Sequence, residues 1–199
     1  MSIKVELEYW DKAAQDPDVD IKYISDIDDD KCLAEILPHL KHHHVLEIGC
    51  GVGRLTSRLY ASSQHGCCQI HGIDISEKML KLAEQNTPSK PDVRYKLCDG
   101  RTIPDFECCK EFDSVYSILT FQHIPDEAKL GYIKEAARVL KSGGIFRVQY
   151  VDGDYHADIH HQTSEENMVK WFEDSGFNID QIDRGKVHPQ WTWITGVKI

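Results

Sequence analysis

The sequence has no long apolar segment and no excess of positive charge. No apolar run approaches the roughly 20 residues of a membrane-spanning helix, and the opening MSIKVELEYW carries charges where a signal peptide needs apolar residues. The 33 Asp and Glu residues outnumber the 23 Lys and Arg residues, which gives a formal net charge of −10. The missing apolar segments favour a cytoplasmic protein that does not bind membranes. Because nucleic-acid binding needs a basic face, we also expect no nucleic-acid partner.

Metal-binding motifs are also scarce. None of the seven cysteines forms a CxxC pair, which excludes a zinc ribbon and a thioredoxin-like site and favours a reduced intracellular protein. The acidic run over residues 16–30 has neither the glycine nor the final glutamate of a calcium loop. The stretch DGDYHADIHHQT, residues 152–163, is rich in Asp and His. We interpret it as a polar loop for substrate recognition rather than a metal site, and we predict no metal.

Strand-like apolar runs alternate with amphipathic stretches along most of the chain. Helices are expected over 30–41, 53–62, 76–86, 126–140 and 164–176, and strands over 44–50, 69–74, 93–99, 112–120, 145–151, 177–185 and 191–199. This alternation predicts an α/β fold, with a three-layer, doubly wound, mostly parallel seven-stranded sheet and an antiparallel C-terminal strand.

Local patterns predict how some of these elements begin, end and pack. Pro38 is expected to end or kink the first helix. The glycines of SGG, residues 142–144, are expected to stop the fourth helix by supplying left-handed backbone. Trp191 and Trp193 alternate on the last strand, so they share a face and pack against a helix layer. The fourth helix is expected to bury the stripe Leu130, Ile133, Ala137 and Leu140.

The stretch HVLEIGCGVGRL, residues 44–55, places three glycines directly after a buried strand. In a doubly wound sheet, ligands bind beyond the carboxyl ends of the strands where the strand order reverses, and the first strand lies at that point. Glycines there allow a sharp turn and let a ligand touch the backbone. The spacing is GxGxG and position 54 is arginine, so the GxGxxG fingerprint of a dinucleotide-dependent oxidoreductase is not met.

Together with Glu47, the glycines form ExGxGxG, which resembles motif I of the class I (Rossmann-like) S-adenosylmethionine-dependent methyltransferases. GIDISEKML at 72–80 resembles the second motif of that superfamily. LCDG at 97–100 and the block 112–148, with its RVLKSGG segment, resemble its later elements in the same order. The resemblance therefore covers residues 44–148.

The resemblance implies S-adenosylmethionine as cofactor and S-adenosylhomocysteine as product. It implies that Asp74 holds the ribose hydroxyls, that Ile75 and Met79 lie against the adenine, and that Asp99 accepts from the adenine amine beside Gly100. From the residues alone, Asp74 as a helix cap and Asp99 as a turn residue stay open. The full expected cofactor set is Glu47, Gly49, Cys50, Gly51, Gly53, Asp74, Ile75, Met79, Asp99, Gly100 and Leu119.

Three further residues border the expected site. His123 follows the fourth strand and is the candidate catalytic residue, because an imidazole can move protons near neutral pH. Its alternative role is packing or capping of the next helix. Tyr9 and Trp10 either close over the cofactor as part of a helical cap or anchor that segment to the core. Arg54 is expected on the helix surface rather than at the carboxylate of the cofactor.

The predicted domain is a single unit, residues 1–199. It comprises a helical cap segment at 1–43, a cofactor-binding core at 44–148, and a substrate loop with the last strands at 149–199. The expected activity is transfer of a methyl group to a small-molecule acceptor by in-line displacement. A protein side chain or N-terminus is the alternative acceptor, and a non-catalytic partner subunit is the third hypothesis. The acceptor atom, the need for a general base and the oligomeric state stay open.

Overall fold

A seven-stranded sheet runs through the middle of the molecule. The computed structural model describes residues 3–16, 18, 28–41, 44–62, 69–87, 92–106, 111–152 and 161–199. The strand order is β3-β2-β1-β4-β5-β7-β6, and β7 runs antiparallel to both of its neighbours while the other neighbouring pairs are parallel. The strands are β1 (His44–Ile48), β2 (Gln69–Asp74), β3 (Val93–Leu97), β4 (Phe112–Ser117), β5 (Leu140–Val151), β6 (Phe177–Arg184) and β7 (Trp191–Lys198). The predicted fold class and its antiparallel C-terminal strand are confirmed.

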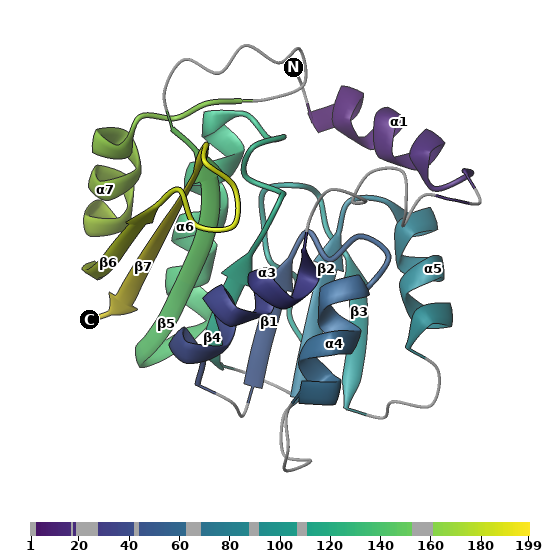
Figure 1. Cartoon of the computed structure of the whole chain (residues 1–199), viewed down its shortest axis with the longest axis horizontal. Coiled ribbons are helices and arrows are strands. Elements are labelled where there is room, and N and C mark those ends of the chain that lie inside the picture. The colour runs from purple at the N-terminus through teal and green to yellow at the C-terminus, as the bar shows by residue number, and fades with distance from the viewer. Residues whose placement is uncertain are drawn as a thin grey trace.

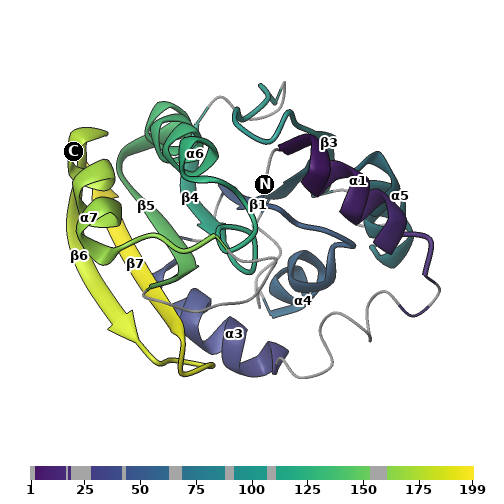
Figure 2. The same cartoon turned by 90° about the horizontal axis from the view of Figure 1, so that it is seen from above.

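Helices cover both faces of this sheet (Figures 1 and 2). Buried side chains of α3 and α4 pack on one face, and those of α6 and α7 pack on the other. Helix α5 lies against β2 and β3 and beside α4, while α1 packs on α5. The helices are α1 (Ile3–Ala13), α3 (Asp29–Ile36), α4 (Arg54–Ser62), α5 (Glu77–Asn86), α6 (Asp126–Val139) and α7 (Glu165–Asp174), with a short 3-10 helix η1 (Leu37–His39) after α3.

The strand order reverses beside β1. This strand pairs with β2 on one side and with β4 on the other, so the connections that leave β1 and β4 turn away in opposite directions. Such a reversal opens a crevice at the carboxyl ends of the two strands. Figure 1 shows α1 lying across this end of the sheet, far in sequence from most of the residues beneath it.

Two local predictions are confirmed. The α-helical geometry of α3 ends at Ile36, and Pro38 lies in the 3-10 turn that follows, as a ring without an N–H requires. Trp191 and Trp193 are both buried, and they pack with the apolar face of α3.

Two predictions for α6 are wrong. The helix ends at Val139, and β5 already begins at Leu140, so Gly143 takes its positive φ of 73° inside the strand and not at the helix end. The buried face comprises Ala128, Lys129, Tyr132, Ile133, Ala136 and Val139, whereas the predicted stripe members Leu130 and Ala137 are only half-buried.

The buried cation on α6 explains this shift of the face. The ammonium group of Lys129 donates to the carbonyl of His161 at 2.7 Å and to Thr163 Oγ1 at 2.5 Å, and it pairs with Asp126 at 3.2 Å. Burial lowers the pKa of Lys129, and the neighbouring Asp126 opposes that change. A long polar side chain with this many partners can occupy a core position that a hydrophobicity pattern assigns to leucine.

Some predictions fall on residues outside those the structure describes. These are most of the acidic run, four of the seven cysteines, and residues 153–160 of the Asp- and His-rich stretch. Among the described residues, no helix is long and apolar enough to cross a membrane.

Candidate cofactor-binding site

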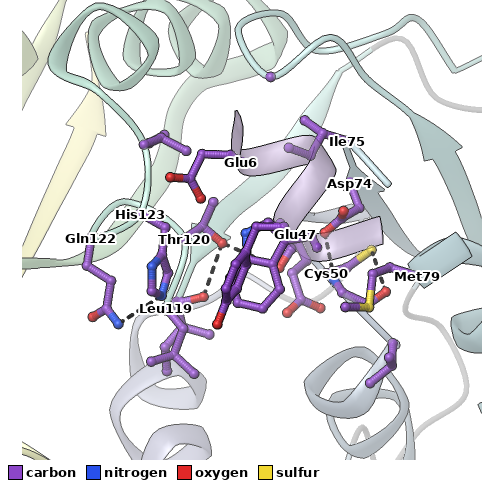
Figure 3. A pocket seen from close by; sticks show the side chains of 18 of the residues that line it. Glu6, Glu47, Cys50, Asp74, Ile75, Met79, Leu119, Thr120, Gln122 and His123 are labelled. Carbon is purple, nitrogen blue, oxygen red and sulfur yellow. Dashed lines mark hydrogen bonds between the residues drawn. The ribbon is translucent and has the colours of Figure 1, made fainter. Parts of the chain in front are cut away.

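A cavity of about 290 Å³ opens at the carboxyl ends of the central strands. Its walls come from α1, from the glycine turn after β1, from the end of β2 and from the segment after β4. In Figure 3, Asp74, Ile75 and Met79 line one side of this cavity, and Glu6, Gln122 and His123 line the other. The cavity therefore lies beyond the carboxyl end of β1, where the sequence analysis expects a ligand to bind.

The glycine turn has two positions with different surroundings. Gly49 has φ +74°, and a Cβ there would lie 1.9 Å from Thr120 Oγ1, so the turn packs directly against the segment after β4. Gly51 has φ +52°, but a Cβ there would meet nothing within 4 Å. Gly49 is therefore required for packing, whereas bare backbone at Gly51 leaves room in the cavity.

Asp74, at the end of β2, fixes this turn. Its carboxylate accepts from the backbone N–H of Gly51 at 2.9 Å and from that of Ser76 at 2.9 Å. Burial raises the pKa of Asp74, and these two hydrogen bonds oppose the rise. Each carboxylate oxygen has a second lone pair, so both can still accept from a ligand. The helix-capping role and a ligand-binding role are compatible.

Glu47, in β1, is a buried carboxyl group at the floor of the cavity. It is 2% exposed, and one oxygen accepts from the hydroxyls of Thr56 and Tyr116, the latter at 2.8 Å. Burial raises the pKa of Glu47 to about 7, while both hydroxyl donors oppose the rise. Both of these hydroxyl partners are neutral, so a cationic ligand group would relieve the cost of ionising Glu47.

The side of the cavity around Ile75 is apolar. Ile75 and Met79 line it, and a Cβ at Gly100 would come within 2.8 Å of Ile3 and 3.2 Å of Ile75. Burial strongly raises the pKa of the Cys50 thiol, which also lines the cavity, so this cysteine is an inert neutral group.

Two residues of the expected cofactor set lie outside the cavity lining. Asp99 is exposed, and one of its oxygens accepts from the backbone N–H groups of Arg101 and Thr102 at 2.8 and 2.7 Å. Although burial opposes the shift, these hydrogen bonds hold the pKa of Asp99 below its usual value. Gly53 lies behind the turn, where a Cβ would meet Tyr95 and Ala83. Asp99 therefore makes the turn that the sequence left open as its alternative role.

The segment after β4 carries a line of buried amides that ends at His123. The backbone N–H of Leu119 donates to Gln149 Oε1 at 2.8 Å, Gln149 Nε2 donates to Gln122 Oε1 at 3.1 Å, and Gln122 Nε2 lies 3.2 Å from His123 Nε2. Leu119 has φ +61°, an uncommon conformation for a residue other than glycine, so the hydrogen bond that its N–H donates to Gln149 holds strained backbone beside the cavity.

Helix α1 supplies one wall of the cavity. The sequence left Tyr9 and Trp10 open between a helical cap over the cofactor and an anchor to the core, and both residues line the cavity. Ile3, Glu6 and Trp10 recur at helical spacing and line the cavity. Glu6 is 4% exposed; burial raises the pKa of its carboxyl group, and a hydrogen bond from the Trp10 side chain opposes that rise. The Trp10 ring also meets His123 edge to face, with 5.3 Å between ring centroids. The only available signal was the position of Tyr9 and Trp10 in a polar stretch.

The expectation for Arg54 is wrong. Its side chain is 18% exposed, lines the cavity and is paired with Asp29 of α3. The reason is that the first turn of α4 faces the crevice, so a residue there is covered by neighbouring elements rather than by solvent.

Ten of the twelve predicted site residues thus meet at one cavity. They are Glu47, Gly49, Cys50, Gly51, Asp74, Ile75, Met79, Gly100, Leu119 and His123. The lining residues that the sequence did not single out are Ile3, Glu6, Val52, Leu55, Ile118, Thr120, Gln122, Ile124 and Tyr132. Within the described part of the chain, no cluster of three or more His, Cys, Asp or Glu side chains could hold a metal ion.

Comparison with known proteins identifies relatives of this chain. A family model described as a methyltransferase domain matches residues 46–148. A ubiquinone biosynthesis O-methyltransferase of Coxiella burnetii is 24% identical over 161 residues, which are 80% of this chain and 65% of that protein. The chain thus spans just under two thirds of the length of this relative.

Solved structures with the same fold include two bound to S-adenosylhomocysteine. DhpI is 18% identical, with a TM-score of 0.76 and coverage of 98% of this chain and 95% of its own. Magnesium protoporphyrin IX methyltransferase from Synechocystis is 19% identical, with a TM-score of 0.68 and coverage of 86% and 82%.

Proposed function

The chain belongs to the methyltransferase-domain family of the class I superfamily, and from this premise we propose that it is an S-adenosylmethionine-dependent methyltransferase acting on a small-molecule acceptor. The observation that carries the proposal is the cavity at the reversal of strand order, with the buried carboxyl group of Glu47 and the half-buried carboxyl group of Asp74 beside an open glycine turn.

The residues present fit this cofactor. Bare backbone at Gly51 leaves room for the amino-acid tail, and Glu47 matches its ammonium group. Asp74 can accept from the ribose hydroxyls, and the apolar side formed by Ile75 and Met79 suits a flat adenine. The remaining members of the proposed cofactor set are Gly49, Cys50, Gly53, Asp99, Gly100 and Leu119. When bound, S-adenosylmethionine supplies a methyl group activated by a sulfonium.

The task of this chain is then to align an acceptor and to exclude water. In-line displacement depends above all on the placement of the reacting atoms. Helix α1 lines the cavity with Ile3 and Trp10, whose apolar surfaces reduce the contact of the site with water. His123 lies on the side away from Asp74 and borders the space for the acceptor (Figure 3).

Two observations favour a small acceptor over a protein. The cavity of about 290 Å³ leaves little room for a peptide beside the donor. The related Coxiella protein is named for O-methylation in ubiquinone biosynthesis, and the related Synechocystis protein for methylation of a porphyrin. A protein acceptor is the second candidate, supported by the negative net charge, which suits a basic peptide.

The test combines donor binding with product analysis. The purified protein should bind S-adenosylhomocysteine in calorimetry, and donor labelled in its methyl group should transfer label to the small-molecule fraction of a cell extract. Asp74→Asn should weaken binding, whereas the exposed control Glu84→Gln on the same side of the sheet should not. Label found only in protein would support the second candidate, and donor binding without any transfer would support a non-catalytic subunit.

A further inference from the structure

The amide line beside the cavity determines which nitrogen of His123 carries a proton. A backbone N–H can only donate, so the Leu119 N–H requires Gln149 Oε1 to face it. Gln149 Nε2 must then donate to Gln122 Oε1, which leaves Gln122 Nε2 facing the imidazole. Since an amide NH₂ only donates, His123 Nε2 must accept.

His123 is therefore a neutral imidazole with its proton on Nδ1. Its basic nitrogen already accepts a hydrogen bond, and protonation there would set two donors against each other across 3.2 Å. Gln122 is 5% exposed and Gln149 is fully buried, so neither amide can turn freely to relieve this conflict. His123 is arranged to hold its proton rather than to take one from a substrate.

The carboxyl group of Glu6 lies on the same side of the cavity as His123. Glu6 is 4% exposed and lines the cavity, and its side-chain hydrogen bond comes from Trp10, which also packs on His123. Figure 3 shows the carboxyl group of Glu6 on the side of Thr120 and His123, away from Asp74 and Met79. Glu47 lies at the floor of the cavity and Asp74 lies on its opposite side, so Glu6 is the lining carboxyl group on the side of His123.

We infer that Glu6 receives the proton of the methyl acceptor, and that the acceptor is a phenolic hydroxyl carried on a planar apolar ring. This inference rests on the proposed function and names the chemistry at its acceptor side. The lining of the cavity supports the planar ring, because Trp10, Ile124 and Tyr132 supply flat or apolar surfaces to it.

The proton balance favours oxygen over nitrogen. A phenol resembles a tyrosine side chain, whose pKa of about 10 lets a carboxylate draw its proton as the bond to carbon forms. An amine acceptor would instead be held as an ammonium ion by the carboxylate, without a lone pair for attack. The phenol oxygen gains the methyl carbon as its O–H bond breaks, the proton passes to Glu6, and the electron pair of the breaking C–S bond stays on sulfur.

Other titratable groups surround the same space and enter any pH profile. Those lining the cavity are Tyr9, Glu47, Cys50, Arg54, Asp74, His123 and Tyr132. Only Glu6 and Tyr9 come from α1, so substitutions on that helix separate the role of Glu6 from that of the carboxyl groups on the sheet.

The first test requires no acceptor. Nitrogen-15 correlation spectra of the imidazole of His123, assigned with His123→Asn, should show the proton on Nδ1 in the S-adenosylhomocysteine complex. Gln122→Glu replaces the donor that faces Nε2 with an acceptor, so the proton should move to Nε2 in that variant. A proton on Nε2 in the unmodified protein would overturn the inference.

The second test measures methyl transfer to 4-methylphenol, whose hydroxyl ionises like that of tyrosine, with 4-methylbenzylamine as the nitrogen counterpart. Glu6→Gln should lower the transfer rate about 100-fold or more and remove the acid limb of the pH profile, while S-adenosylhomocysteine affinity stays within about twofold. His123→Asn should keep the acid limb. Glu8→Gln, an exposed change on the same helix, should match the unmodified protein.

The outcomes distinguish a failure of the inference about Glu6 from a failure of the proposed function. Transfer to the amine alone, no transfer to the phenol despite donor binding, or an unchanged rate in Glu6→Gln would overturn the inference and leave the proposed function intact. Failure of the unmodified protein to bind S-adenosylhomocysteine would instead remove the proposed function itself.

Discussion

Replacing Glu47 by glutamine should make the protein more stable without the donor and less able to bind it. The amide oxygen of Glu47→Gln can still accept from Thr56 and Tyr116, so the local hydrogen bonds survive. What is lost is a carboxyl group that must ionise while buried. The variant therefore isolates the cost of that charge from the packing around it.

The size of the effect follows from the pKa of about 7 in the folded chain against 4.5 for an ordinary glutamate. Between these values the folded state holds a proton that the unfolded state has released, so stability falls as pH rises through this window. The full difference is about 3 kcal/mol. Above pH 7, the variant should be more stable than the unmodified protein by up to about this amount, and near pH 4 the two should converge.

Affinity for the donor should rise with pH over the range in which the stability of the free protein falls. If the donor ammonium pairs with ionised Glu47, affinity falls about tenfold per pH unit below 7, which is about 30-fold between pH 8.5 and pH 5.5. Calorimetry with S-adenosylhomocysteine across this range, in buffers of different ionisation enthalpy, should also detect proton release in acidic solution. Glu47→Gln should bind at least about tenfold more weakly at pH 8 and with little pH dependence.

Two results would refute this account. One is an affinity of the unmodified protein that stays constant between pH 5.5 and pH 8.5. The other is urea denaturation at pH 8 that finds Glu47→Gln no more stable than the unmodified protein, which would show that burial of the charge carries no cost.

Four further substitutions test other parts of the site and core. Asp74→Asn keeps a hydrogen-bond acceptor for Gly51 but removes the charge, so calorimetry should find donor binding about 10- to 100-fold weaker; undiminished affinity would contradict the assignment. Gly49→Ala places a methyl group against Thr120 and should cost about 2–4 kcal/mol in denaturant unfolding, whereas Gly51→Ala enters open space and should cost about 1 kcal/mol while blocking donor binding. Equal losses of stability in this pair would contradict the packing argument. His71 is fully buried, both ring nitrogens lack a partner among the described residues, and burial lowers its pKa to about 4. Because the unfolded chain binds a proton there from about pH 6.5 downward, stability falls as pH drops towards 4. His71→Leu should lose that decline, and an unchanged acid decline in thermal unfolding would contradict it.

The sequence was most informative where backbone and charge requirements coincide. The glycine turn and Asp74 could be predicted because a bend after a buried strand and a carboxyl group at the next strand end leave few alternatives in a doubly wound sheet. The structure adds the reason for two of the glycines. A side chain at Gly49 would collide with Thr120, and the absence of one at Gly51 leaves open space in the cavity.

Predictions failed where polar groups occupy buried positions. Glu6 and Lys129 are charged residues that a hydrophobicity pattern places at the surface, yet both are buried. Lys129 is satisfied by partners about 32 to 34 residues away in the chain, which no local pattern encodes. The amide line from Leu119 to His123 likewise joins residues about 30 positions apart, so its consequence for the imidazole becomes visible only in three dimensions.

Helix α1 contacts the rest of the molecule at both of its ends. Asp11 accepts from the Ser76 hydroxyl and pairs with Lys78, while Ile3 packs beside Gly100 and Ile75 on the donor side of the cavity. Glu6 lies on the helix between these two anchors. Grafting the corresponding segment of another family member onto residues 4–9, with both anchors and Trp10 retained, is therefore a route to exchange the residues that face the acceptor. The same short replacement is a route by which related family members diverge.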